Sequence, residues 1–236
     1  MSLYCKRVGI IGALDEEVEQ LIGMMTPVLG ADLPPHLHDM GRHFYFGKIK
    51  NQEVVVVRCG VGKVNSSITA QRLIDSYDVS AVISIGVAGG VDPRLKRSDI
   101  IISEKHLHHD MLGFGGPGEI PMMDSSVFHS SEGMVACAKR ACETILEKGQ
   151  FHVGLNVTGD QFIQSHEKKH WLFNTFGALC SEMEGVGVAQ TCNINKVPFL
   201  GIRSISDLAD DDAIQSFDEH KQAAIDRLVS VVVQML

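Results

Sequence analysis

The sequence lacks the basic excess that is typical of nucleic-acid-binding proteins. Its 236 residues include 21 Lys and Arg against 29 Asp and Glu, a formal net charge of −8. This balance argues against a nucleic-acid surface, although it allows a nucleoside ligand, which carries no phosphate. The hydrophobic content of 44% is ordinary for a globular protein, and no segment resembles a linker. We therefore expect a single domain over residues 1–236.

Long apolar runs and closely spaced cysteine pairs are also missing. No run approaches the ~20 residues of a membrane span. The run from Val8 to Leu14 is too short for a secretory signal, because Asp15, Glu16 and Glu17 end it. None of the six cysteines forms a CxxC pair, and several lie in apolar runs, as reduced cysteines of cytosolic proteins do. We expect a cytoplasmic protein without membrane contact.

Motifs for cofactors and metals are equally scarce. Neither GxGxxG nor GxxxxGK[ST] occurs, so dinucleotide and triphosphate ligands lose support. A possible metal site is the cluster His106, His108, His109 and Asp110, since the first two histidines would share a face on a strand. No further ligand set accompanies this cluster. We therefore predict no metal and no cofactor.

Strands and helices alternate along the chain, which is typical of an α/β sandwich with a largely parallel or mixed sheet. A long irregular segment is expected between His106 and Met123, where glycine and proline are frequent. Apolar runs predict strands at 8–13, 43–49, 54–58, 79–85, 99–103, 151–157, 178–183 and 199–205. Helices are predicted from residue 15, at 64–74, 132–148 and 167–171, after residue 184 and at the C-terminus.

Carboxylates follow two of the predicted strands. Glu182 and Glu184 end the strand that begins at Ala178, and Asp207 follows the strand from Phe199. In open α/β sheets, ligands bind beyond the carboxyl ends of the strands. These three acids are therefore expected in one pocket. Further strand-to-loop junctions with glycine lie at residues 12–17, 86–90 and 159–163, where backbone can approach a ligand closely.

Seven short motifs occur in one order along the chain: GIIGALDEEV (9–18), GVGKV (60–64), VAGG (87–90), GDQFI (159–163), EMEG (182–185), RSISD (203–207) and SFDE (216–219). Any one of them alone is weak, since acids at a helix start or a strand end are common, but the ordered set is specific. It resembles the 5′-methylthioadenosine/S-adenosylhomocysteine nucleosidase family. The resemblance runs from about Val8 to near the C-terminus.

The resemblance implies hydrolysis of the N-glycosidic bond of 5′-thioalkyl adenosines, with release of adenine. It implies a nucleoside phosphorylase-like fold, a three-layer α/β/α sandwich with a central mixed β-sheet. It also implies a homodimer, no metal and a small-molecule adenine nucleoside as the ligand. By position, Asp207 is the general acid at adenine N7, and Glu17 activates the attacking water.

The same resemblance assigns substrate contacts. Glu184 would hold the ribose hydroxyls with Met183 beside the sugar, while Phe162 packs on the purine and the Ile163 backbone reads its edge. Gly89 would line the sugar side. The remaining residues of the expected substrate-binding set are Val61 and Phe217, for the thioalkyl pocket, and Glu182, Arg203 and Ser206.

Physical chemistry supports these roles independently. Cleavage of a nucleoside C–N bond builds an oxocarbenium-like sugar and pushes electrons into the base, so it needs an acid on the base and a carboxylate near the sugar. Asp207 must hold a proton near pH 7, which requires a pKa raised by burial or by neighbouring acids. Glu17 is expected to ionise more easily, because it lies at a helix N-terminus.

Three departures from the family pattern concern the pocket. Val87 stands where several members carry a hydroxyl, and Leu14 replaces a common Met. The segment from Met111 to Ile120, expected near a partner's pocket, is shorter and richer in glycine, so Phe114 and Pro121 are candidates for its contacts. These changes bear on the 5′ substituent more than on the adenine chemistry.

Three alternatives remain open at this point. A phosphorylase of the same fold would need cations at the early loop, where acids at residues 15–17 repel phosphate. A nucleosidase for another modified nucleoside such as an aminofutalosine would use the same site. A non-catalytic nucleoside-binding protein would not need Glu17, Glu184 and Asp207 together.

Overall fold

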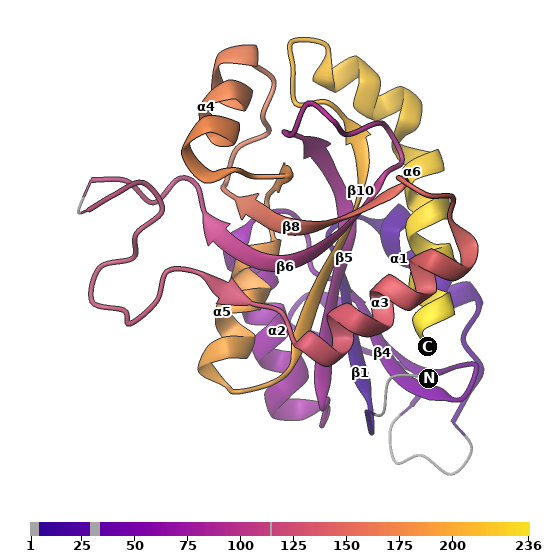
Figure 1. Ribbon diagram of the computed structural model, residues 1–236. Coiled ribbons are helices and arrows are strands. Elements are labelled where there is room, and N and C mark those ends of the chain that lie inside the picture. The colour runs from indigo at the N-terminus through magenta and orange to yellow at the C-terminus, as the bar shows by residue number, and fades with distance from the viewer. Residues whose placement is uncertain (1–4, 29–33, 114) are drawn as a thin grey trace.

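A central mixed sheet with helices on both faces forms the body of the chain (Figure 1). The computed structural model describes residues 5–28, 34–113 and 115–236. Its strands are β1 (Val8–Gly12), β2 (His36–Asp39), β3 (Arg42–Ile49), β4 (Gln52–Arg58), β5 (Ala81–Gly90), β6 (Ile100–His108), β7 (Phe128–His129), β8 (Phe151–Thr158), β9 (Cys180–Glu182) and β10 (Phe199–Asp207). Its helices are α1 (Asp15–Gly23), α2 (Lys63–Ser76), α3 (Glu132–Ile145), α4 (His166–Phe176), α5 (Gly185–Ile194) and α6 (Ala213–Met235). The predicted three-layer sandwich is confirmed.

Strand β1 shows how the sequence builds two cores. Its side chains alternate between the two faces of the sheet, as in any strand. Val8 and Ile10 pack with residues of α1, α3 and α6, whereas Ile11 packs with residues of α2 and α5. The helices therefore form two layers that bury β1 completely, which explains its continuous apolar sequence.

The sheet closes on itself beside the expected site. The strand order is β10-β6-β8-β9-β5-β1-β4-β3-β2, and β10 also pairs with β5. Strands β5, β9, β8, β6 and β10 thus form a closed ring. The short strand β9 runs antiparallel to β5, with Gly89 opposite Ser181, and parallel to β8. The ring, which local sequence patterns did not predict, brings the ends of β5, β9 and β10 together.

Other differences from the predicted elements are local. Residues 106–108 are not irregular but belong to β6, because His106 and His108 pair with Asn156 and Thr158 of β8. Helix α3 ends at Ile145 rather than at residue 148, and β2 was not predicted. The segment between β6 and β7 is irregular and projects from the body (Figure 1). Phe114 lies outside the described residues. No helix of the described part is long and apolar enough to cross a membrane.

Candidate active site

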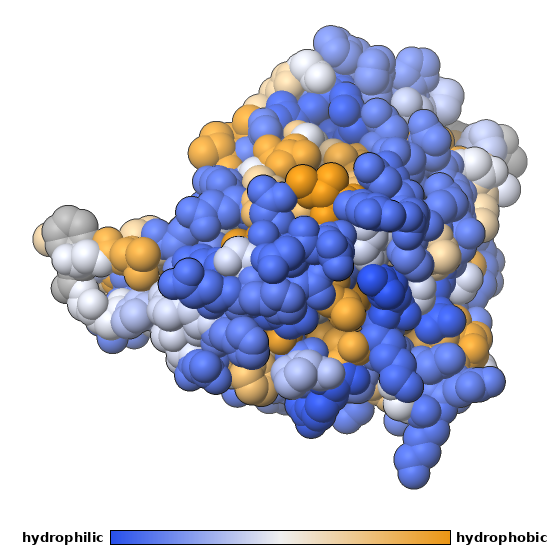
Figure 2. Space-filling view, turned by 90° about the horizontal axis from the view of Figure 1, so that it is seen from above, coloured by the Kyte–Doolittle hydropathy of each residue, from blue (hydrophilic) through white to orange (hydrophobic). Residues whose placement is uncertain are grey.

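A cavity of about 200 Å³ lies where β5, β9 and β10 end. All of the predicted site residues line it except Arg203. On the face seen from above, hydrophobic residues gather in the middle and are bordered by hydrophilic ones (Figure 2). The lining residues are Ala13, Leu14, Glu17, Val61, Val87, Ala88, Gly89, Gln161, Phe162, Ile163, Ser181, Glu182, Met183, Glu184, Ser206, Asp207 and Phe217.

Asp207 ends β10 and is buried in the cavity wall. Its Oδ1 accepts a hydrogen bond from the backbone N–H of Ala209 (2.9 Å), and its Oδ2 accepts one from the Ser206 hydroxyl (2.8 Å). Burial raises the pKa of Asp207 above its ordinary value, and the charge of Asp210 adds to this, although the two hydrogen bonds act against it. The raised pKa is the direction that a general acid near neutral pH requires.

Glu17 lies in the first turn of α1, directly after β1. Its Oε2 accepts hydrogen bonds from the backbone N–H groups of Ala13 (2.6 Å) and Leu14 (2.9 Å), and its Oε1 accepts one from Val87 (3.0 Å). Only 2% of Glu17 is exposed. Burial raises its pKa despite these hydrogen bonds. The expectation of easier ionisation was therefore wrong, because desolvation outweighs the helix N-terminus here.

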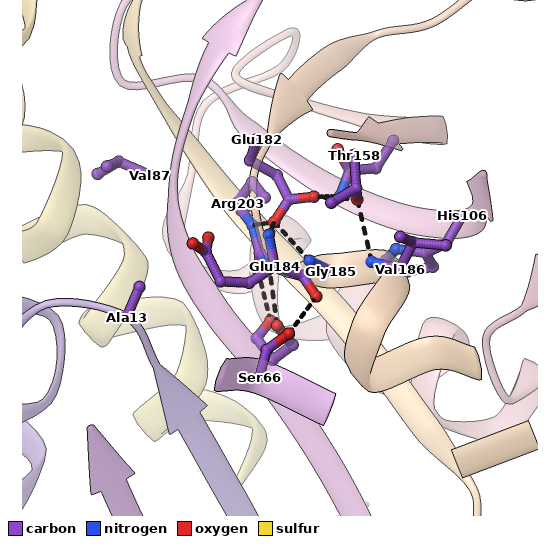
Figure 3. Close-up of polar contacts among 12 residues, drawn as sticks. Ala13, Ser66, Val87, His106, Thr158, Glu182, Glu184, Gly185, Val186 and Arg203 are labelled. Carbon is purple, nitrogen blue, oxygen red and sulfur yellow. Dashed lines mark hydrogen bonds and ion pairs between the residues drawn. The ribbon is translucent and has the colours of Figure 1, made fainter. Parts of the chain in front are cut away.

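Glu182 and Arg203 form a buried ion pair under the cavity (Figure 3). The Arg203 Nη2 lies 2.7 Å from Glu182 Oε2, and the guanidinium also donates to the backbone carbonyl and hydroxyl of Ser84. Arg203 is 1% exposed and does not line the cavity. Arg203 was predicted to bind substrate, but its side chain does not face the cavity. Its N–H groups donate to Glu182 and to Ser84 of β5 instead.

The Glu182 carboxylate is saturated with donors. Oε1 accepts from the Thr158 hydroxyl and from Asn156 Nδ2, and Oε2 also accepts from the backbone N–H of Gly185 (2.7 Å). Burial alone would raise the pKa of Glu182, but the charge of Arg203 and these hydrogen bonds outweigh it and lower the pKa. Glu182 is therefore an ionised part of the framework.

Glu184 caps α5 and is the less restrained carboxylate of the motif. Its Oε1 accepts a hydrogen bond from the backbone N–H of Gly62 (2.8 Å), while the Ser66 hydroxyl holds its carbonyl oxygen (3.0 Å). Figure 3 shows its side chain extending away from Ser66. Burial and the negative charge of Glu182 raise the pKa of Glu184. Gly62 has φ +101°, a conformation that favours glycine and aims its N–H at this carboxylate.

A charged clamp fixes the rim of the cavity. The Lys63 ammonium at the start of α2 lies 2.7 Å from Asp110, which follows β6 by two residues. The backbone N–H of Lys63 donates to Asp160, and the backbone N–H of Asp160 donates to Asp110 (both 3.0 Å). These bonds hold the turn with Gly62 against the loop that carries Phe162.

The upper wall of the cavity is apolar. The rings of Phe162 and Phe217 meet edge to face, with centroids 5.9 Å apart at 90°. Phe162 is 42% exposed and Ile163 is buried. Val61 and Met183 complete this wall. Such a surface suits a flat, uncharged base and an apolar substituent.

Sequence reasoning missed several lining residues as site members. Leu14 and Val87 were noted only as departures, while Ala13, Ala88, Gln161 and Ser181 carry no signal of their own. Five of these six residues lie inside the motifs, and Ser181 directly precedes the motif that begins at Glu182. The motifs themselves were therefore the signal that could have found them.

The histidine cluster does not act as a unit. His106 is buried below the cavity beside Phe199, and burial lowers its pKa to about 4. His108 pairs with Gln190 (3.0 Å), and Asp110 belongs to the rim clamp. Within residues 5–28, 34–113 and 115–236, no group of three or more His, Cys, Asp or Glu side chains could hold a metal ion.

Known proteins resemble the whole chain. A family model described as the phosphorylase superfamily matches residues 7–236. The 5′-methylthioadenosine/S-adenosylhomocysteine nucleosidase of Marinomonas sp. (strain MWYL1) is 35% identical over 233 residues, 97% of each chain. The crystal structure of a nucleosidase of the same name from Neisseria meningitidis, in complex with methylthio-immucillin-A, has a TM-score of 0.90 at 31% identity over 98% of both chains. A futalosine hydrolase of Helicobacter pylori has a TM-score of 0.89 at 31% identity, over 98% of this chain and 97% of its own.

Proposed function

The chain belongs to the phosphorylase superfamily and, within it, to the 5′-methylthioadenosine/S-adenosylhomocysteine nucleosidase family, and we propose that it hydrolyses the N-glycosidic bond of these two nucleosides. The products are adenine and the corresponding thioribose. The observation that carries this proposal is the meeting of Glu17, Glu184 and Asp207 in one cavity with an apolar upper wall. This activity would serve methionine salvage and the removal of adenosylhomocysteine.

The three carboxylates divide the chemistry among them. As the bond between C1′ and N9 breaks, its electron pair moves into the base, and the proton of Asp207 goes to N7. The oxygen of a water molecule bonds to C1′, and its proton goes to Glu17. Glu184 accepts hydrogen bonds from the ribose hydroxyls while the sugar becomes cationic. This is the acid–base logic of glycoside hydrolysis.

The charge around the cavity favours water over phosphate as the nucleophile. Among the described residues that line it, none is Lys or Arg. Arg203 is bound to Glu182 behind the wall, and Lys63 is bound to Asp110 at the rim. A phosphate dianion would meet Glu17 and Glu184 with no free cation to balance its charge.

A second candidate substrate is an aminofutalosine, because a futalosine hydrolase shares the fold over nearly the whole chain. Its 5′ substituent would meet the wall at Val61 and Phe217. The lining there is apolar, which suits the methylthio group of methylthioadenosine. It does not separate adenosylhomocysteine from an aminofutalosine, because both carry polar 5′ substituents. The adenine chemistry would be the same for both substrates.

We also propose a homodimer in the cytoplasm. Val61, Val64 and Ile68, at and beside the start of α2, are exposed by 47%, 72% and 38%, as large apolar residues at an interface would be. Because Val61 also lines the cavity, a partner there would lie close to the 5′ pocket. The described residues of the segment 111–120 project on the left in Figures 1 and 2 and include exposed Leu112, which suits a contact with that pocket. The six cysteines, most of them buried, are not joined by disulfides in the described chain, which fits a reducing compartment.

The test is to incubate the protein with methylthioadenosine, adenosylhomocysteine or an aminofutalosine, each with and without phosphate, and to measure free adenine. We expect adenine from the two thioadenosines at a rate that phosphate does not raise. The Glu17→Gln variant should bind adenine but release none from substrate. A sugar phosphate among the products would establish a phosphorylase instead. Faster release from the aminofutalosine would establish that nucleoside as the substrate.

A further inference from the structure

Ser181 is a polar residue of the cavity that the proposed chemistry leaves unused. It lies in the middle of β9 and lines the cavity, although only 5% of its surface is exposed. Its Oγ is buried and has no hydrogen-bond partner in the part of the chain that the structure describes. Ser206, the other serine of the lining, donates to Asp207 and is satisfied. An unpaired buried hydroxyl is costly, so Ser181 calls for a partner.

The sheet register relates Ser181 to the general acid. Gly89 of β5 pairs with Asp207 of β10 on one side and with Ser181 of β9 on the other. Residues that pair across a ladder place their side chains on the same face of the sheet. A Cβ on Gly89 would lie 3.0 Å from Asp207 Oδ1, so Asp207 occupies this face. Asp207 and Ser181 therefore flank a position without a side chain, with their backbones about 10 Å apart, two strand spacings.

We propose that the Ser181 hydroxyl donates a hydrogen bond to N3 of the adenine base, an inference that rests on the function proposed above. Under that function, N7 faces Asp207 and the Ile163 backbone reads the edge with N1 and the 6-amino group. N3 is then the ring acceptor without a partner. N3 and N7 lie on opposite sides of N9, as Ser181 and Asp207 lie on opposite sides of Gly89.

This bond has a chemical consequence for the reaction. The base receives the electron pair of the broken C–N bond, so the electron density at N3 increases as the bond breaks. A donor at N3 stabilises the leaving base together with the proton at N7. The serine hydroxyl can reach this position by rotation about its Cα–Cβ bond, which has three staggered states. Ser181 would then contribute to both binding and leaving-group stabilisation.

The experiment is a double-mutant-type cycle in which the Ser181→Ala variant is combined with replacement of adenine by an analogue that lacks N3. Calorimetry measures Kd for adenine and for 3-deazaadenine, in which a CH group replaces N3. We expect Ser181→Ala to weaken adenine binding roughly two- to twelvefold, the range of a neutral hydrogen bond. The variant should leave the Kd of 3-deazaadenine unchanged. In turnover, the same variant should lower kcat/KM for methylthioadenosine.

Ser204→Ala is the matched control. The Ser204 Oγ is also buried without a partner in the described chain, but Ser204 does not line the cavity. Ser204→Ala should leave the Kd of both bases unchanged. Because each variant removes an unpaired hydroxyl, neither should lower Tm in the absence of ligand.

Two results would overturn the role of Ser181: equal weakening of both bases by Ser181→Ala, or no weakening of adenine. Failure of the proposed function gives a different pattern. If the wild type binds adenine but releases none from the thioadenosines, the enzymatic proposal fails, and the binding cycle still decides the contact to N3. If the wild type does not bind adenine, both proposals fail.

Discussion

Glu182 and Glu184 are separated by one residue but lie in opposite electrostatic environments. Glu182 belongs to the floor beneath the cavity, where Arg203, Thr158 and Asn156 surround its carboxylate. Glu184 belongs to the wall, where only the N–H of Gly62 binds its carboxylate among the described residues. The pKa of Glu182 is lowered and that of Glu184 is raised. Burial is common to both, so the partners decide the difference.

This contrast extends to the whole site. The floor is a closed network in which each charge is matched, and it holds β8, β9 and β10 in register. Among the described residues, no Lys or Arg forms an ion pair with Glu17, Glu184 or Asp207 in the wall, and burial raises the pKa of each. Groups that exchange protons near neutral pH need such an environment. We infer that the residues of the floor stabilise the fold, whereas the carboxylates of the wall carry out the reaction.

The largest effect is expected for Asp207→Asn, in the wall. The amide keeps the shape but carries no acidic proton, so kcat should fall by roughly 10²–10⁴-fold, the usual contribution of a general acid. The Tm should change little. Asp211→Asn, a change of an exposed acid in the same loop, is the control and should retain activity. Near-normal turnover of Asp207→Asn would contradict its role and weaken the division.

The next effect concerns stability and belongs to the floor. Glu182→Gln leaves Arg203 buried without a countercharge, and breaking a buried pair in this way costs about 3–5 kcal/mol. Urea unfolding would measure this loss. Glu184→Gln makes the same chemical change two residues away without leaving a cation unpaired, so it should not destabilise the protein at pH 7. Equal losses in the two variants would show that floor and wall do not differ.

The pH dependence of stability should separate the same two residues. The folded state binds a proton at Glu184 more tightly than the unfolded chain does, so this residue makes stability fall as pH rises above about 4.3, the ordinary pKa of Glu. Removing it in Glu184→Gln should give a stability advantage that grows toward alkaline pH, at most by about 1.4 kcal/mol per pH unit. Unfolding midpoints at pH 5, 6, 7 and 8 measure this.

Glu182 changes the stability with pH in the opposite direction to Glu184. Its lowered pKa contributes stability above pH about 4.3 that is lost as pH falls through the folded value. The deficit of Glu182→Gln should therefore be full at neutral pH and shrink only in acid. Parallel curves for both variants would contradict the assigned pKa directions.

The sequence predicted the wall better than the floor. Glu17, Glu184 and Asp207 stand at strand or helix ends, and such junctions can be recognised from local patterns. Arg203 belongs to the same motif as Asp207, but its side chain turns to Glu182 because β10 lies beside β5 in a closed ring. Pairing between distant strands determines this orientation, and no local pattern contains it.

The same reason explains the other misjudged segments. His106 and His108 look like loop residues because glycine and proline follow them, yet pairing with β8 makes them strand residues. Burial raises the pKa of Glu17, and a hydrogen bond that opposes this rise comes from the backbone N–H of Val87, 70 residues away in the chain. Sequence patterns indicate which residues end strands, whereas desolvation requires the assembled neighbours.

The smallest effect is expected at the upper wall of the cavity, where the rings of Phe162 and Phe217 meet edge to face. Such a pair is worth about 0.5–1.5 kcal/mol beyond its buried area, so Phe217→Leu should raise KM for methylthioadenosine roughly two- to tenfold with little change in kcat. Phe176→Leu is the matched control, because Phe176 meets Trp171 edge to face at 5.3 Å and 89° but does not line the cavity. It should lower Tm without changing KM. If Phe217→Leu lowered kcat instead, Phe217 would contribute to the chemical step. The three carboxylates would then not be the only residues of the cavity that do so.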